Sequence, residues 1–192
     1  MTLRRLPRWA PAGAIVLAAA VVGMVELAGD DDRPDAVVLE SSAALFDTLD
    51  DLVAASDLVV IATVNEIAEG RTITSPDDAD AGIRTRLVEL GVIDVLHGNA
   101  SDQLIVEEAA AFADGTPIVL DGMTELGEAD SAVWFLVAGG SETMPYFAAV
   151  NSQGRFQITG TLDPSGDDPL SQELASLSSQ KLTKAVRNAS GG

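Results

Sequence analysis

Hydrophobic residues recur along this chain with two different periods, and the periods separate a predicted helix from predicted strands. Between residues 43 and 55, leucine and valine recur at spacings of three and four with aspartates between them, which predicts a short amphipathic helix. Residues 58–64 then form a run rich in β-branched side chains between polar flanks. This run predicts a largely buried strand.

Extended segments follow on both sides of a polar stretch. Residues 83–96 alternate hydrophobic and polar positions and contain Gly91, where we expect a bend or a bulge. Residues 104–108 predict a strand that returns beside this segment as a hairpin. Residues 69–82 hold turn formers and acids with almost no hydrophobic content, and they predict an exposed loop.

The second half of the chain contains shorter hydrophobic runs. Residues 118–120 and 132–137 each predict a buried strand between turn-forming residues. Residues 146–150 and 155–158 flank the segment Asn-Ser-Gln-Gly, whose composition predicts the turn of a β-hairpin.

The tail predicts a helix after a polar loop. Asp168 has the side chain of an N-cap, and Pro169 suits the first helical position. Leucines then recur at spacings of four and three over residues 170–177. Cations follow at the far end, where the helix dipole favours positive charge: Lys181, Lys184 and Arg187.

The amino terminus predicts export from the cytoplasm. Arginines within residues 4–8 precede a hydrophobic run from Trp9 to Leu27, the order found in signal peptides and signal anchors. A run of roughly 18 residues is long enough to span a bilayer. We favour an uncleaved anchor, with the membrane contacted through residues 9–28 and the remaining chain outside the cytoplasm. A cleaved signal peptide and a secreted domain are the alternative.

These patterns divide the chain into parts. They are a signal-anchor or transmembrane segment (1–28), an acidic linker (29–42), a β-barrel domain (43–162), and a loop with a C-terminal amphipathic helix (163–192). Short antiparallel strands lose their exposed edges by closing into a barrel. The expected fold class is therefore mainly β: a small antiparallel barrel with an N-terminal and a C-terminal flanking helix, preceded by a single hydrophobic membrane helix.

Charge and composition exclude several classes of function. The chain has 11 Lys and Arg against 30 Asp and Glu, a net charge of -19, so it lacks the basic surface that nucleic-acid binding requires. It contains no cysteine and one histidine, which excludes disulfides, iron–sulfur clusters and multi-histidine metal sites. We expect no cofactor and no bound metal.

Three segments resemble the netrin and metalloproteinase-inhibitor modules, which have an OB-type barrel. These segments are residues 55–64, residues 95–98 at the end of a long strand, and residues 133–137 with their aromatic pair. The likeness covers residues 43–160 and implies an OB-like barrel. Uncharacterised exported bacterial envelope proteins are similar at residues 84–86 and 150–156.

The resemblance does not bring the inhibitors' mechanism to this chain. Those inhibitors chelate a catalytic zinc through an amino-terminal cysteine, and this chain has no cysteine. The apolar-Lys-Gly segment that ends their long strand is Leu96-His97-Gly98 here. His97 lies in a predicted turn and no G-x-S-x-G segment accompanies it, so the sequence does not indicate a serine hydrolase.

The favoured hypothesis is an extracytoplasmic binding module that recognises a protein or a cell-envelope ligand. Its candidate ligand surface is the polar segment with Asn151, Gln153 and Arg155. Acids outnumber cations, so the stronger expectation for Arg155 is an ion pair with a neighbouring acid. Trp134 and Phe135 lie in a hydrophobic run and are expected in the core. The alternative function is an envelope hydrolase with paired carboxylates, for which we assign no catalytic residue.

Overall fold

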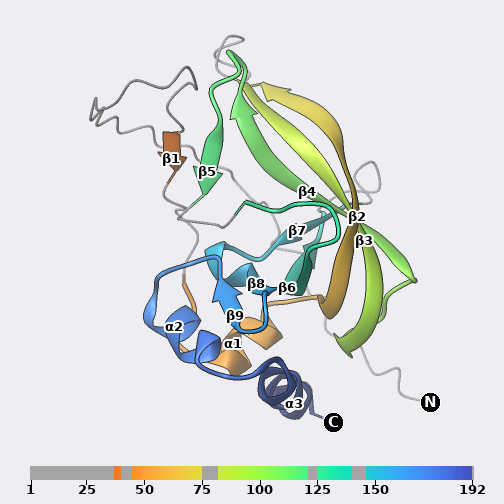
Figure 1. Cartoon of the computed structure of the whole chain (residues 1–192), viewed down its shortest axis with the longest axis vertical. Helices are drawn as coiled ribbons and strands as arrows, with labels where there is room; N and C mark the ends of the chain where they lie inside the picture. Colours follow the sequence, from red (N-terminus) through yellow and green to blue (C-terminus); the bar gives the residue numbers. More distant parts are fainter. Residues whose placement is uncertain (1–36, 40–44, 75–81, 121–124, 140–145, 192) are drawn as a thin grey trace, which may run out of the picture.

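Strands dominate the structure, and seven of them form one sheet that curls into a partial ring (Figure 1). The computed structural model describes residues 37–39, 45–74, 82–120, 125–139 and 146–191. Helices pack against the sheet at one end of the molecule (Figure 1). Within the described residues no helix has the length and hydrophobicity to cross a membrane. The predicted membrane segment, residues 1–28, lies outside them.

The ring begins with long antiparallel strands, β2 (Leu58–Thr74), β3 (Gly82–His97) and β4 (Gln103–Phe112). The predicted hairpin of β3 with β4 is confirmed. The loop predicted over residues 69–82 is wrong in its first part, since β2 continues to residue 74. Cross-strand pairing with β3 keeps this part extended, although its composition favours turns. Residues 75–81 lie outside the described residues.

β-Bulges bend the β2–β3 ladder at positions that differ from the prediction. The register shifts between Val64 and Glu66, which leaves Asn65 as an extra residue of β2. The ladder passes through Gly91 in regular register, so the bulge expected at this glycine is wrong. A Cβ atom on Gly91 would lie 3.0 Å from Oδ1 of Asn65. The glycine therefore leaves room for the bulged asparagine.

β6 (Ser131–Ala138) closes the ring because both of its edges are paired. One edge pairs antiparallel with β2, and the other pairs with β7 (Phe147–Ala149) and β8 (Arg155–Ile158). β7 also pairs in parallel with β4, which completes the ring β2-β3-β4-β7-β6. β9 (Leu162–Pro164) extends the sheet beyond β8.

The predicted hairpin of residues 146–150 with residues 155–158 is wrong. β7 and β8 pair one after the other with β6 and run in the same direction, so they form one strand with an interruption. The interruption contains a 3-10 turn, η1 (Ser152–Gly154), which is capped by the side chain of Asn151. The turn-forming composition therefore marks an insertion within a strand rather than a reversal of the chain.

Alternation along the strands creates hydrophobic cores on both faces of the sheet. The inner core lies within the ring and includes Leu58, Val60, Val88, Leu90, Val106, Trp134 and Leu136. The outer core lies between the sheet and the helices and includes Leu52, Val59, Val133, Phe135, Phe156, Leu174 and Leu182. Trp134 and Phe135 are both 0% exposed, so their expected places in the core are confirmed.

The N-terminal part of the domain contains a shorter helix than predicted and one strand that was not predicted. α1 (Leu49–Ala54) begins after its N-cap Thr48, within the helix predicted over residues 43–55. β1 (Val37–Leu39) pairs in parallel with β5 (Ile118–Leu120) in a separate two-stranded sheet. β5 confirms a predicted strand, whereas β1 falls within the segment predicted as a linker.

The tail forms two helices where one was predicted. α2 (Pro169–Ala175) has the expected N-cap, Asp168, and the expected proline at its start. It ends before Ser178, which caps a new helix, α3 (Ser179–Ala189). Because α3 starts here, Lys181 lies in its first turn, and the predicted interaction of this lysine with a helix C-terminus is wrong.

We expect Leu182→Ala to destabilise the protein by about 2–5 kcal/mol, because this side chain of α3 is fully buried in the outer core. Urea denaturation followed by circular dichroism measures the change. Lys184→Ala, on the exposed side of the same helix, is the matched control and should cost less than about 0.5 kcal/mol. Equal effects of the two substitutions would show that α3 does not cover the core.

Candidate functional site

The candidate ligand surface predicted from the sequence lies mostly inside the protein. Gln153 is 0% exposed and Arg155 is 1% exposed, while Asn151 is half-buried. The prediction of an exposed ligand surface does not agree with this burial. Gln153 and Arg155 face neighbouring elements of the domain, and their contacts are structural.

The Gln153 side chain connects the segment before α1 to the start of α2. Its Oε1 accepts a hydrogen bond of 2.8 Å from the backbone N–H of Phe46, and its Nε2 donates one of 3.0 Å to the Phe46 carbonyl. The same Nε2 donates to Oδ1 of Asp168 at 2.7 Å. One buried amide therefore joins two segments that are distant in sequence.

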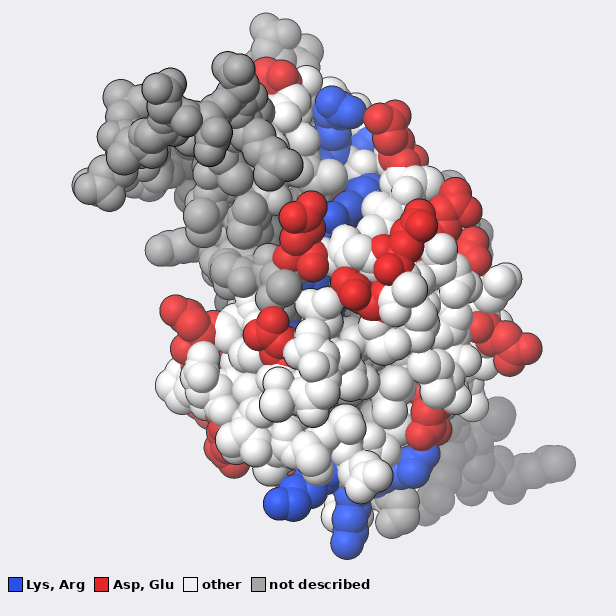
Figure 2. Space-filling model, viewed as in Figure 1, with Lys and Arg blue, Asp and Glu red and all other residues white. Residues whose placement is uncertain are grey.

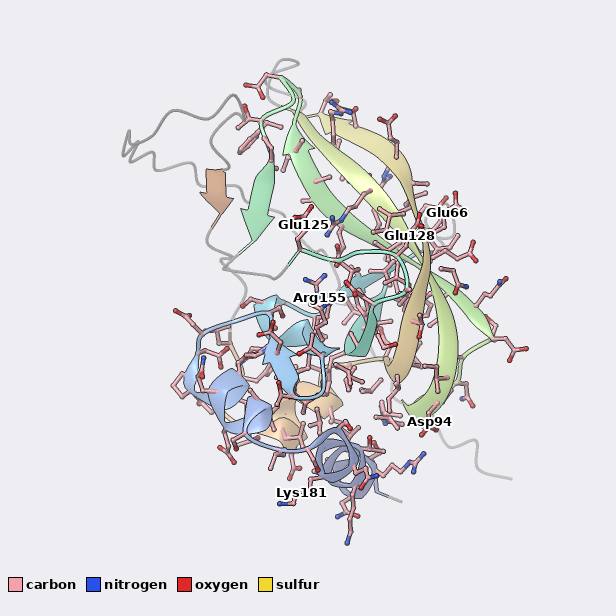
Figure 3. All side chains as sticks on the ribbon, in the orientation of Figure 1. Glu66, Asp94, Glu125, Glu128, Arg155 and Lys181 are labelled. Atoms are coloured by element: carbon pink, nitrogen blue, oxygen red, sulfur yellow. The ribbon has the colours of Figure 1, made fainter. Side chains whose placement is uncertain are left out.

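Arg155, which is labelled in Figure 3, belongs to a buried ionic cluster. Its Nη1 lies 3.4 Å from Oε1 of Glu108, whose Oε2 accepts a hydrogen bond of 2.7 Å from Arg86. The guanidinium carbon lies 5.6 Å from the ring centroid of Trp134, a cation–π contact. Burial lowers the pKa of Arg155, and the Glu108 carboxylate opposes this shift. The expected ion pair of Arg155 is confirmed.

The cluster shares its face of the sheet with hydrogen-bonding atoms that lack partners. Trp134 pairs with Arg155 across β6 and β8, and Ala132 pairs with Gln157, so these side chains point to the same face. Nε1 of Trp134 and Oε1 of Gln157 are buried and have no hydrogen-bond partner in the described part of the chain. Polar side chains therefore lie on this face beside the inner core. The Arg155 guanidinium is held there by packing against Trp134 and by the charge of Glu108.

A polar depression lies on the outer face of the ring and was not predicted from the sequence. It has a volume of about 740 Å³ and is lined by Asn65, Gly91, Ser101, Asp102 and Gln103. These residues come from β2, β3, the β3–β4 turn and β4. The signal in the sequence was Gly91, because a glycine within a strand often marks the close approach of another group.

Hydrogen bonds hold the side chains at the edge of this depression. Oε1 of Glu89 accepts from Nδ2 of Asn65 at 3.4 Å and from Nε2 of Gln103 at 3.3 Å. Ile105 pairs with Glu89 across the strands and is 38% exposed. The depression thus presents amides and carboxylates next to a small apolar surface, a combination suited to hydrogen bonding with a neutral polar ligand.

Three acids of β3 and β4 make ion pairs with arginines, which bears on the alternative of a hydrolase with paired carboxylates. Glu107 pairs with Arg71 at 2.8 Å, and Asp94 pairs with Arg187 at 2.7 Å. Glu108 belongs to the buried cluster described above. Among the described residues, no group of three or more metal-ligating side chains could hold a metal ion.

Comparisons with known proteins do not assign this chain to a family. The sequence matches no protein-family model and no curated protein. Function is therefore inferred from the strand order, the polar depression and the amino-terminal sequence.

We expect Glu108→Gln to destabilise the protein by about 3 kcal/mol, because it removes the carboxylate between two arginines, one of them fully buried. Glu107→Gln is the matched control at the next position. Its partner Arg71 has a side chain that is 43% exposed, so we expect a loss of about 1 kcal/mol or less. Urea denaturation of both variants tests the difference, and equal losses would contradict the role of burial.

Ionisation of Asp168 is expected to contribute to the pH dependence of the free energy of unfolding. Partial burial opposes its ionisation, but hydrogen bonds from Ser171 and Gln153 outweigh this effect and hold its pKa below the ordinary value of 3.8. Because the pKa of Asp168 is lower in the folded than in the unfolded protein, its ionisation stabilises the fold at pH values above the unfolded-state pKa. This stabilisation is lost as the pH falls through the folded-state pKa.

We therefore expect Asp168→Asn to cost stability at neutral pH and to cost less as the pH approaches 2. Asparagine keeps the capping oxygen and removes the charge. Unfolding free energies of wild type and variant between pH 7 and pH 2 measure the effect. Asp167→Asn, at an exposed neighbouring position, is the control. A difference in unfolding free energy between wild type and Asp168→Asn that does not change with pH would contradict the lowered pKa of Asp168.

Proposed function

We propose that this protein is an OB-type binding module held on the outer side of a membrane. The order of the ring strands supports the OB assignment. Counted along the chain within the ring, the first strand pairs with the second and the fourth, and the third pairs in parallel with the fifth. OB-type barrels are five-stranded Greek-key barrels of this kind, and they serve as binding modules in many proteins.

The amino-terminal sequence supports the location. Arginines precede a hydrophobic run at residues 9–28, and the segment over residues 29–42 separates this run from the domain. An arrangement of this kind inserts with the positive flank in the cytoplasm and the following domain outside. The proposal is a domain tethered close to the membrane surface, or a secreted domain if the run is removed.

The polar depression supports a neutral, hydroxyl-rich ligand such as a saccharide of the cell envelope. OB-type barrels bind oligosaccharides and oligonucleotides on the face of their second and third strands, which are β3 and β4 here. The depression is open to solvent and is lined by Gly91 of β3, by Gln103 of β4 and by the turn between them, with Asn65 of β2 beside them. A chain with a net charge of -19 repels nucleic acids, so a neutral ligand is favoured at the depression.

We expect Gly91→Val to weaken saccharide binding at least tenfold, because the new side chain would occupy the depression beside Asn65. Gly91 is not among the glycines with positive φ in the described chain, and valine is favoured in strands, so the fold should be retained. Thr72→Val, at an exposed position of β2 far along the same ladder, is the control and should bind as wild type.

Binding is measured by titrating the full chain with neutral oligosaccharides released from bacterial cell wall, using isothermal calorimetry. Melting curves followed by circular dichroism verify that both variants are folded. If wild type binds and Gly91→Val binds equally well, the ligand does not occupy the depression. If wild type binds no neutral oligosaccharide, the saccharide proposal is wrong.

A further inference from the structure

α3 carries positive charge and no acid, in a chain where acids are nearly three times as frequent as cations. Its cations are Lys181, Lys184 and Arg187. Leu182 and Val186 of the same helix are buried in the outer core. Lys184 is two residues from each of them, about 200° around the helix, so it points away from the domain.

The charges of the two lysines of α3 are not explained by ion pairs within the described part of the chain. Lys181 and Lys184 make no ion pair with any residue that the structure describes. A lysine in the first turn of a helix is disfavoured by the dipole, and Lys181 is in that position. Arg187 alone has a local partner, Asp94 at 2.7 Å. The two lysines therefore remain available to an external anion.

These cations gather at one end of the molecule. On the face drawn in Figure 2, lysine and arginine lie at the end of the long axis where α3 lies, and a second group of cations lies toward the other end among acidic side chains. Figure 3 places Lys181 and Asp94 at this same end. A molecule with such a separation of charge has a preferred orientation near a charged surface, because the acidic part is repelled and the basic end is attracted.

We infer that the surface formed by Lys181, Lys184 and Arg187 docks on a bilayer that contains anionic phospholipid. We call it the α3 basic face. The inference rests on the proposed tether, which keeps the domain near the membrane at high effective concentration. Two lysines near an anionic surface raise the partition constant about thirtyfold. An effect of this size orients a tethered domain but does not recruit a free one.

The test uses the full chain in vesicles of phosphatidylcholine, with or without about a third phosphatidylglycerol. Flotation with the neutral vesicles first establishes whether residues 1–28 anchor the protein. The chain has no cysteine, so Asn188→Cys on α3 and Thr72→Cys near the far end of β2 each provide a single site for a fluorophore. Quenching by bromine-labelled lipid then reports contact with the bilayer.

We expect quenching at position 188 only in the vesicles with phosphatidylglycerol, and none at position 72. Lys181→Gln with Lys184→Gln should reduce the contact population about thirtyfold, and half-molar salt should also reduce it, because charges are then screened. Lys181→Arg with Lys184→Arg keeps the charges and should retain the quenching. An anchored protein without quenching at position 188 overturns the docking and leaves the proposed function intact.

The remaining outcome separates the two proposals. If the chain does not float with neutral vesicles, the anchor is wrong. The docking of a tethered domain is then overturned together with the anchor, whereas an absence of quenching in an anchored protein overturns the docking alone.

Discussion

The structure depends on one strand whose two edges are both hydrogen-bonded. β6 pairs with β2 on one side and with β7 and β8 on the other, and it contributes side chains to the cores on both faces of the sheet. Without this strand the long β2–β3–β4 sheet would have an open edge, and the helices would lose part of the surface on which their hydrophobic side chains pack. Ring closure and helix packing therefore share a single cause.

Burial on both faces also explains which elements the sequence predicts. A strand with two covered faces reads as a continuous hydrophobic run, which is how β6 and the first half of β2 were recognised. The outer half of β2 is polar on both faces and reads as a loop, because only its pairing with β3 keeps it extended. Local capping signals were equally readable, since Asp168 and Pro169 act within one turn of helix.

Features that depend on distant partners could not be read from the sequence. The Asn-Ser-Gln-Gly segment has the composition of a hairpin turn, but the strand after it continues along β6. Gln153 is a polar residue in a turn-like segment, and its burial follows from the position of Phe46, far away in the chain. The ion pair of Arg155 was predictable from the excess of acids. The polar depression was not, since its residues belong to three strands and a turn.

The covered position of β6 has a consequence for the lifetime of the folded protein. Ala-Val-Trp-Phe-Leu-Val, residues 132–137, is uncharged and rich in β-forming residues, the composition of segments that assemble into cross-β fibrils. In the folded domain neighbouring strands occupy both of its edges, so no template is exposed. The transient release of β7 and β8 from β6 would expose one edge without global unfolding. Shelf life is then limited by the frequency of this local opening rather than by the overall stability.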